Sequence, residues 1–257
     1  MEYFIICLVA FLGSGLTLFS GFGLGTILVP VFAIFFPIEI AIALTAIVHF
    51  LNNIFKLALL GKYADKGVIL RFGIPSVFAA LLGAYVLAIL TKVEPLATYQ
   101  LNSSIFEITM IKLTIAVLLI LFALFDLVPR LAHLQFDKKY LPLGGLLSGF
   151  FGGLSGNQGA LRSAFLIRAN LTKETFIASG VVIACLIDIS RLIVYSKQII
   201  KIEEPFNYPL ITAATLSAFA GAYIGNRQLK KVTIKTVQYI VGIMLFVFAL
   251  LLAFGII

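Results

Sequence analysis

Long apolar runs separated by short polar connections dominate the chain. A segment needs about 20 residues to cross a hydrocarbon core of roughly 30 Å, and the pattern predicts that most of the chain lies in such segments. None of the connections is long enough for a soluble domain, so a single membrane domain over residues 1–257 is expected. Met1 and Glu2 provide no basic region before the first run, which is therefore interpreted as structure and not as a removable signal. The predicted apolar segments are residues 3–36, 38–60, 68–91, 109–128, 142–167, 174–195, 209–228 and 235–257.

Two of these segments are interrupted by glycine. Residues 3–36 would form a helix of about 51 Å if unbroken, yet residues 20–26 read Ser-Gly-Phe-Gly-Leu-Gly-Thr and Pro30 follows. Residues 142–167 carry a similar glycine-rich stretch that turns polar at its centre. Glycine runs and proline break helices, so each segment is predicted to be a broken-helix hairpin.

The two interrupted segments occupy matching places in a weak internal repeat. The repeat predicts two related halves, residues 1–128 and 140–257. At an offset of 135, Ser20-Gly21 aligns with Ser155-Gly156, Thr45 with Gly180, Asn53 with Asp188 and Lys56 with Arg191; at an offset of 138, Gly83-Ala84-Tyr85 aligns with Gly221-Ala222-Tyr223.

Composition excludes several classes of protein. Hydrophobic residues make up 61% of the chain and charged residues 12%, against roughly 25% charged in a soluble domain. A soluble enzyme, a nucleic-acid-binding module and a disordered chain are therefore excluded as the main interpretation. Cys7 and Cys185 both lie in apolar runs and define neither a disulfide framework nor a metal site.

The net charge of +8 comes largely from the connections. Residues 56–71, 130–139, 168–173 and 227–235 are rich in lysine and arginine, whereas residues 92–108 and 196–208 are poorer. If both interrupted segments are hairpins, every strongly basic connection falls on one side, which the positive-inside rule assigns to the cytoplasm. Each half is then a hairpin plus three helices, the halves are inverted, and both termini lie outside a cell membrane.

The second hairpin carries the polar residues best suited to an anion. Ser155, Asn157, Gln158 and Arg162 lie among glycines, and a half-helix N-terminus with an arginine fork is a receptor for an oxyanion or carboxylate. The alternative is a turn whose polar groups cap its own helix ends. In the first hairpin, the backbone N–H groups around Gly21, Gly23, Gly25 and Thr26 are predicted to close the same site.

Residues 38–60 place polar side chains on one helical face. His49, Asn52, Asn53 and Lys56 follow at helical spacing, and Asp188 and Arg191 occupy the matching register of the second half. His49 is interpreted either as a core histidine or as a ligand for a proton or substrate. Asp188 and Arg191 form either a fixed ion pair or a coupling pair, and Lys56 is expected to snorkel to the surface.

Glycines four residues apart form ladders that favour close packing of helices in lipid. These faces suit a homodimer as well as packing within the chain. The ladders are Gly21/Gly25, Gly145/Gly149/Gly153, Gly152/Gly156 and Gly221/Gly225.

At these motifs the chain resembles the TauE/SafE family of sulfite exporters and sulfonate-permease-like transporters. The resemblance rests on residues 21–26 with Pro30, on residues 149–159 followed by Arg162, and on Asp188-Ile-Ser-Arg191. It implies an all-α multi-spanning permease for small sulfur-containing or organic anions such as sulfite or a sulfonate. Many members have plain glycine-rich sequence where this chain has Asn157, Gln158 and Arg162, which favours a subgroup with its own substrate.

The expected function is therefore a secondary transporter of a small anion, proton-coupled through His49 or Asp188, with alternating access around a midplane site. No cofactor, metal or nucleic acid is expected. One rival is a passive anion channel with the same architecture, and another is an intramembrane enzyme that uses His49 and Asp188. A non-transporting assembly subunit would leave Asn157 and Arg162 without a cavity. Nucleotide-binding, nucleophile-elbow and metalloprotease motifs are absent from the sequence, so an enzyme is not expected.

Overall fold

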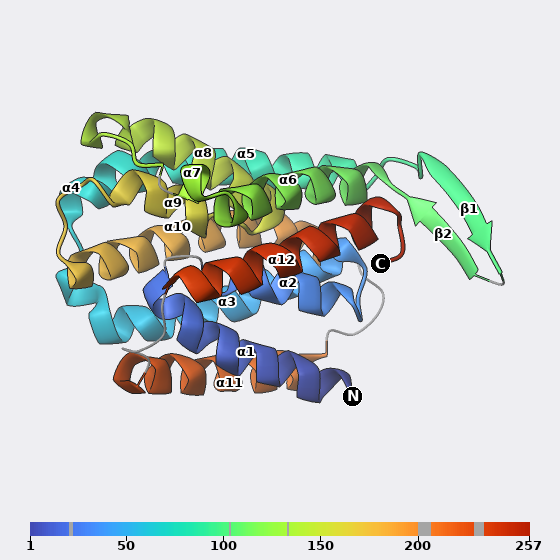
Figure 1. The fold of residues 1–257 in the computed structure, drawn as a ribbon, viewed down its shortest axis with the longest axis horizontal. Coiled ribbons are helices and arrows are strands. Elements are labelled where there is room, and N and C mark those ends of the chain that lie inside the picture. The colour runs from blue at the N-terminus through green and yellow to red at the C-terminus, as the bar shows by residue number, and fades with distance from the viewer. Residues whose placement is uncertain (21–22, 103, 133, 200–206, 229–233) are drawn as a thin grey trace.

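The computed structural model describes residues 1–20, 23–102, 104–132, 134–199, 207–228 and 234–257. The chain is mainly helical, and most of the helices run side by side along the long axis of the molecule (Figure 1). The first half contains α1 (Glu2–Ser20), α2 (Gly25–Ala33), α3 (Ile38–Leu60), η1 (Gly61–Tyr63), α4 (Lys66–Val68), η2 (Ile69–Gly73), α5 (Ile74–Leu90), β1 (Ala97–Leu101), β2 (Ser104–Ile108), α6 (Met110–Leu127) and α7 (Pro129–Ala132). The second half contains η3 (Lys138–Tyr140), α8 (Leu141–Ser155), α9 (Gly159–Leu166), α10 (Lys173–Ile199), α11 (Tyr208–Gln228) and α12 (Ile234–Ala253).

Both predicted helix breaks are confirmed. The first apolar segment is divided into α1 and α2, and the fifth into α8 and α9. Gly23 and Gly156 lie in these two breaks with φ values of +86° and +80°, a left-handed conformation in which glycine has no side chain to clash. Gly156 caps the C-terminus of α8. Each hairpin therefore reverses at a glycine that no larger residue replaces without strain.

The two hairpin tips meet inside the protein. A Cβ atom on Gly25, the first residue of α2, would lie 3.1 Å from the carbonyl oxygen of Gly156. All nine residues of α2 are buried, so this short helix and its irregular ends are enclosed by protein. Backbone that is not regularly hydrogen-bonded is tolerated at membrane depth only in such surroundings or beside a cavity.

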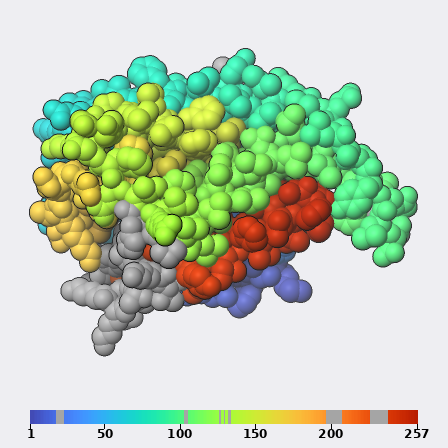
Figure 2. Space-filling model, turned by 45° about the horizontal axis from the view of Figure 1, so that its top comes forward, coloured from blue at the N-terminus to red at the C-terminus, as the bar shows by residue number. Residues whose placement is uncertain are grey.

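Helices of one half pack mainly on helices of the other. The helix α1 lies along α11, α5 along α8, α3 along α10, and α6 along α12. Figure 2 shows the last pair side by side on the surface, with α6 in green and α12 in red. The main contacts between helices therefore join the first half of the chain to the second.

The glycine ladders lie at these contacts. Gly145, Gly149 and Gly153 of α8 face backbone carbonyl groups of the η2–α5 segment, and Gly221 of α11 faces the carbonyl of Phe11 in α1. A Cβ atom at any of these positions would clash with backbone atoms, so the missing side chain is what lets the helices approach. The interpretation as packing faces is confirmed for the ladders of α8 and α11, which are both used within the chain. Gly21, a member of another predicted ladder, lies outside the described residues.

The expectation that the chain is entirely α-helical is wrong for residues 97–108. Strands β1 and β2 form an antiparallel hairpin in which Tyr99 pairs with Phe106, and the two rings stack with centroids 5.3 Å apart. Thr98 and Ile105 add β-branched side chains, which favour strands. The hairpin projects beyond the helices (Figure 2), where water can satisfy its outer edges.

Three helical stretches in the described residues are long and apolar enough to cross a membrane, namely Ile38–Tyr63, Lys66–Leu90 and Lys173–Ser196. Shorter apolar helices cover Glu2–Thr17, Met110–Phe125 and Gln238–Ala253. On the outer face of α5, Phe78, Leu82, Tyr85 and Ile89 are exposed at helical spacing. A stripe of this kind suits contact with lipid.

The two ends of the molecule differ in what they carry. Both chain termini lie at the same end as the β-hairpin (Figure 1), and Tyr99 donates a hydrogen bond to the Phe254 carbonyl there. We call this the terminal end. The described parts of the lysine- and arginine-rich connections around residues 62–71, 130–139 and 168–173 lie at the opposite end, which we call the basic end.

Candidate functional site

A small cavity extends from the tip of the first hairpin towards the basic end. Its volume is about 30 Å³, space for about two water molecules. Helix α3 runs towards the basic end and α10 runs away from it, so residues before Asp188 in α10 and after His49 in α3 lie on that side. The lining residues are Thr17, Gly23, His49, Asn53, Lys56, Arg162, Ser163, Leu166, Phe176, Ile177, Gly180, Val181 and Ala184.

The polar face predicted on α3 supplies one wall of the cavity. His49, Asn53 and Lys56 line it, and all three are buried. Asn52 instead faces α1, where it contacts the hydroxyl of Ser14. The helical spacing therefore identified the correct face, although Asn52 contacts α1 and does not line the cavity.

The expectation that Lys56 snorkels to the surface is wrong. Its side chain is only 4% exposed and lines the cavity together with Arg162. With the Asn52 amide turned to suit its neighbours, its oxygen accepts from Lys56 Nζ at 3.2 Å. Helix α3 continues for another turn beyond Lys56 to Leu60, and residues of α9 and α10 line the same cavity as the Lys56 side chain.

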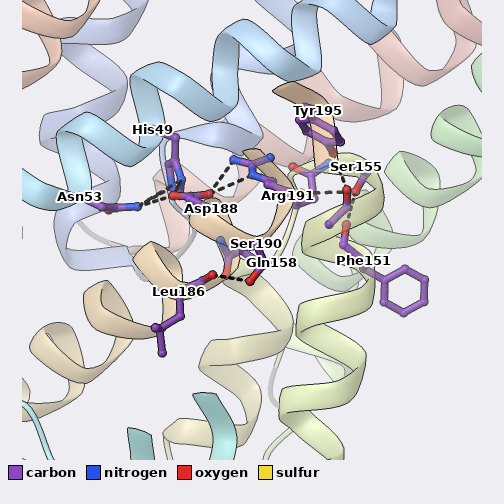
Figure 3. Close-up of polar contacts among 12 residues, drawn as sticks. His49, Asn53, Phe151, Ser155, Gln158, Leu186, Asp188, Ser190, Arg191 and Tyr195 are labelled. Carbon is purple, nitrogen blue, oxygen red and sulfur yellow. Dashed lines mark hydrogen bonds and ion pairs between the residues drawn. The ribbon is translucent and has the colours of Figure 1, made fainter. Parts of the chain in front are cut away.

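His49, Asp188 and Arg191 form a buried network across the α3–α10 contact (Figure 3). His49 Nδ1 lies 2.7 Å from Asp188 Oδ2. Arg191 binds the other carboxylate oxygen, Oδ1, through Nε at 3.0 Å and Nη2 at 2.8 Å. Asn53 donates to Asp188 Oδ2 at 3.2 Å. One carboxylate thus joins the two helices and fixes the orientation of the imidazole ring.

In the second hairpin, some polar residues stabilise the turn and one, Arg162, lines the cavity. Arg162 Nη1 donates to the side-chain oxygen of Gln158 at 3.3 Å, and Arg162 reaches the cavity. Ser155 donates to the Phe151 carbonyl and accepts from the backbone N–H of Asn157, so its hydroxyl caps the turn, as the alternative interpretation has it. Asn157 and Gln158 are buried but do not line the cavity.

The first hairpin approaches His49. A Cβ atom on Gly23 would lie 3.2 Å from His49 Nε2, so a side chain there would displace the imidazole. Gly23 lines the cavity, whereas Gly25 and Thr26 are buried at the start of α2. Gly21, also predicted to close the site, lies outside the described residues.

Buried charge in this region is unbalanced. Lys56, Arg162 and Arg191 are each at most 7% exposed, and Asp188 is the one buried carboxylate among the side chains that the structure describes. Arg191 and Asp188 neutralise each other in a close ion pair. Two further basic side chains, Lys56 and Arg162, line the cavity together. Charged groups are costly away from water, and an anion bound beside both side chains would lower that cost.

No cluster of three or more histidine, cysteine or acidic side chains that could hold a metal ion occurs in the described ranges. Cys7 and Cys185 are free thiols.

The sequence analysis missed several of the residues that line the cavity, among them Thr17 and Gly180. Thr17 is a polar residue in the first apolar segment, a signal that was present but is common in membrane helices. Gly180 lies opposite Arg162, whose Nε would be 3.4 Å from a Cβ atom at that position. The alignment of Gly180 with Thr45 in the repeat pointed to this position without indicating its role.

Comparison with known proteins adds one finding. The sequence model of the family described as "Sulfite exporter TauE/SafE" matches residues 6–252. No curated protein sequence matches the chain. The match spans both hairpins, all the cavity residues and the buried network.

Proposed function

The chain belongs to the TauE/SafE family of sulfite exporters, which are membrane transporters, and on this premise we propose that it carries a small sulfur oxyanion such as sulfite through the cavity by alternating access. The anion binds between Lys56 on α3 and Arg162 on α9, with Asn53 and His49 completing the lining. Members of one fold can differ in substrate, so the argument rests on this site.

The observation that carries the proposal is that two buried basic side chains line one cavity. Lys56 and Arg162 lie in the same cavity, and the nearby carboxylate of Asp188 is already shared by His49, Asn53 and Arg191. An oxyanion offers several acceptor oxygens to an ammonium group and a guanidinium fork at once. A cation would meet repulsion in the same place.

Alternating access is supported by the way the halves pack. In the proposed repeat, the helices α1, α3, α5 and α6 of the first half correspond to α8, α10, α11 and α12 of the second. The contact between α1 and α11 then has a symmetry-related counterpart in the contact between α8 and α5. Both contacts are present. The pairs α3–α10 and α6–α12 map onto themselves. Such a relation, with broken helices meeting at its centre, is typical of transporters built from inverted repeats.

The coupling proton is assigned to the His49–Asp188 pair. His49 is held by Asp188 on one side and lines the cavity on the other. Imidazole gains and loses a proton near neutral pH, so this group joins the anion site to the buried network. Protonation of His49 adds positive charge beside the anion and strengthens its binding. Proton binding and anion binding are thereby coupled.

Sulfite flux in proteoliposomes tests the transport function. The wild-type protein is expected to give saturable sulfite flux that shows counterflow, which a passive channel does not show. Replacing Lys56 with methionine removes one of the two basic groups that line the cavity, at similar side-chain length. We expect the half-saturating concentration of sulfite to rise by roughly tenfold or more, as for loss of a hydrogen bond to a charged group.

The matched control for this test is Lys62→Met, because Lys62 is exposed beyond the end of α3. Its flux should equal that of the wild type. Equal effects of the two substitutions, or wild-type flux that never saturates, would refute the assignment of the cavity as the transport site.

The charge at the two ends supports one orientation in the cell membrane. We assign the basic end to the cytoplasm and the terminal end, with both termini and the β-hairpin, to the outside. A cysteine replacing exposed Gln100 in β1 should react with a membrane-impermeant maleimide in intact cells. A cysteine replacing exposed Lys139 should react only after the cells are made permeable. The opposite labelling pattern would reverse the assignment.

A further inference from the structure

We infer that the contact between the two hairpin tips covers a second oxyanion site, built from Arg191, Thr45 and Asn157, on the terminal side of the cavity. This inference rests on the proposed transport function. It assigns a ligand-binding role to three buried groups that the cavity described above does not use.

Polar atoms without partners mark the position of this site. Thr45 Oγ1, Arg191 Nη1 and both side-chain polar atoms of Asn157 have no hydrogen-bond partner within the described residues. All three side chains are at least nine-tenths buried, with exposed fractions of 0%, 0% and 3%. Buried polar groups are nearly always hydrogen-bonded in proteins, so a group of them in one place indicates a missing ligand or water.

The residues that carry these atoms lie at the point where the tips touch. A Cβ atom on Gly156 would lie 2.8 Å from Arg191 Nη1, and one on Gly25 would lie 3.7 Å from the methyl group of Thr45. Gly25 and Gly156 are themselves in contact, and Asn157 directly follows Gly156. Figure 3 shows Arg191 between Asp188 and the end of α8 at Ser155. A small separation of the tips would therefore open a space bordered by all three groups.

The position along the helices places this space on the other side of the buried network. Thr45 lies one turn before His49 in α3, towards the terminal end, whereas Asn53 and Lys56 lie towards the basic end. Arg191 lies beyond Asp188 in α10 and also points towards the terminal end. In the internal repeat Arg191 aligns with Lys56. The basic residue of the second site therefore occupies the position in the second half that corresponds to Lys56, the basic residue of the cavity, in the first half.

The chemistry of the site selects an anion. The Arg191 guanidinium supplies positive charge and a donor that is not used by Asp188, and the Thr45 hydroxyl and Asn157 amide supply further neutral donors. The nine-residue helix α2 begins at Gly25 and directs the positive end of its dipole to the same point. Together these groups fit a small oxyanion of the same class as the one bound in the cavity.

Sided transport measurements test the inference. In right-side-out and inside-out membrane vesicles, Thr45→Val and Asn157→Leu should each raise the half-saturating sulfite concentration at the terminal face by about tenfold, the effect of losing one hydrogen bond to a charged ligand. At the basic face the same constant should change less than twofold. Because the Thr45 hydroxyl has no partner in the described structure, Thr45→Val should leave the melting temperature of the purified protein unchanged or higher.

The matched control is Thr215→Val, which removes another buried hydroxyl without a described partner but lies in α11, away from the tips. It should alter neither face. Equal changes at both faces, or no change at either, would overturn the second site while leaving transport intact. Absence of sulfite flux in wild-type vesicles would refute the transport function itself, and the second site with it.

Discussion

Replacing Arg162 with alanine should reduce saturable sulfite flux by about 100-fold, because truncating one partner of a buried charged contact costs about 3 kcal/mol. Arg162 is 7% exposed, lines the cavity and donates to Gln158. Its removal takes one of the two basic side chains out of the cavity and leaves the Gln158 oxygen without this donor. Flux into proteoliposomes, measured at sulfite concentrations below saturation, reports the loss directly.

Arg162→Lys separates charge from geometry. The ammonium group keeps the charge but cannot present two parallel donors to an oxyanion, so flux should recover only in part. Arg168→Ala is the matched control, because Arg168 is exposed just beyond α9 and bonds to Gln135. Unchanged flux in a correctly folded Arg162→Ala protein would remove this residue from the anion site.

Replacing Gly149 with leucine should destabilise the fold more than any single change on the lipid-facing surface. A Cβ atom at Gly149 would clash with the carbonyl oxygen of Ser76 and lie 2.6 Å from its Cα atom. These are backbone atoms, so α8 and α5 must separate along their contact. Overpacking of this kind costs about 3 kcal/mol, which corresponds to a fall of roughly 6–12 °C in melting temperature for a chain of this size.

Thermal unfolding of the purified protein in detergent measures this effect. Gly67→Ala is the matched control, because Gly67 is exposed and its added Cβ atom would meet only the Asp65 side chain at 3.2 Å. Equal melting temperatures of the Gly149→Leu and wild-type proteins would show that the α5–α8 contact adapts to side chains, contrary to the packing described.

The helix plan could be predicted closely from sequence because it depends on local chemistry. The predicted segment 38–60 matches α3, and the predicted breaks near residues 20–26 and in 142–167 match the ends of α1 and α8. Apolar length sets where a membrane helix fits, and glycine at positive φ sets where it stops. The β-hairpin was missed because residues 97–108 are too short and too polar to stand out beside long apolar segments.

The sequence could predict which residues belong to the site, but not how they are arranged in space. The helical face that carries His49, Asn53 and Lys56 follows from spacing alone. Which of its members share a cavity depends on helices distant in the chain: α1 covers Asn52, α9 brings Arg162 opposite Lys56, and α10 brings Asp188 to His49.

By itself, the sequence determined that this protein is a helical membrane protein of the TauE/SafE family, with two glycine-broken hairpins and buried polar residues. It did so because apolar length, glycine and charge act over a few neighbouring residues. Only the tertiary structure decided that Lys56 is buried, that Ser155 serves its own turn, and that the tips meet at Gly25 and Gly156. Those outcomes depend on which helix faces pack together, and that choice depends on shape complementarity between segments far apart in the chain.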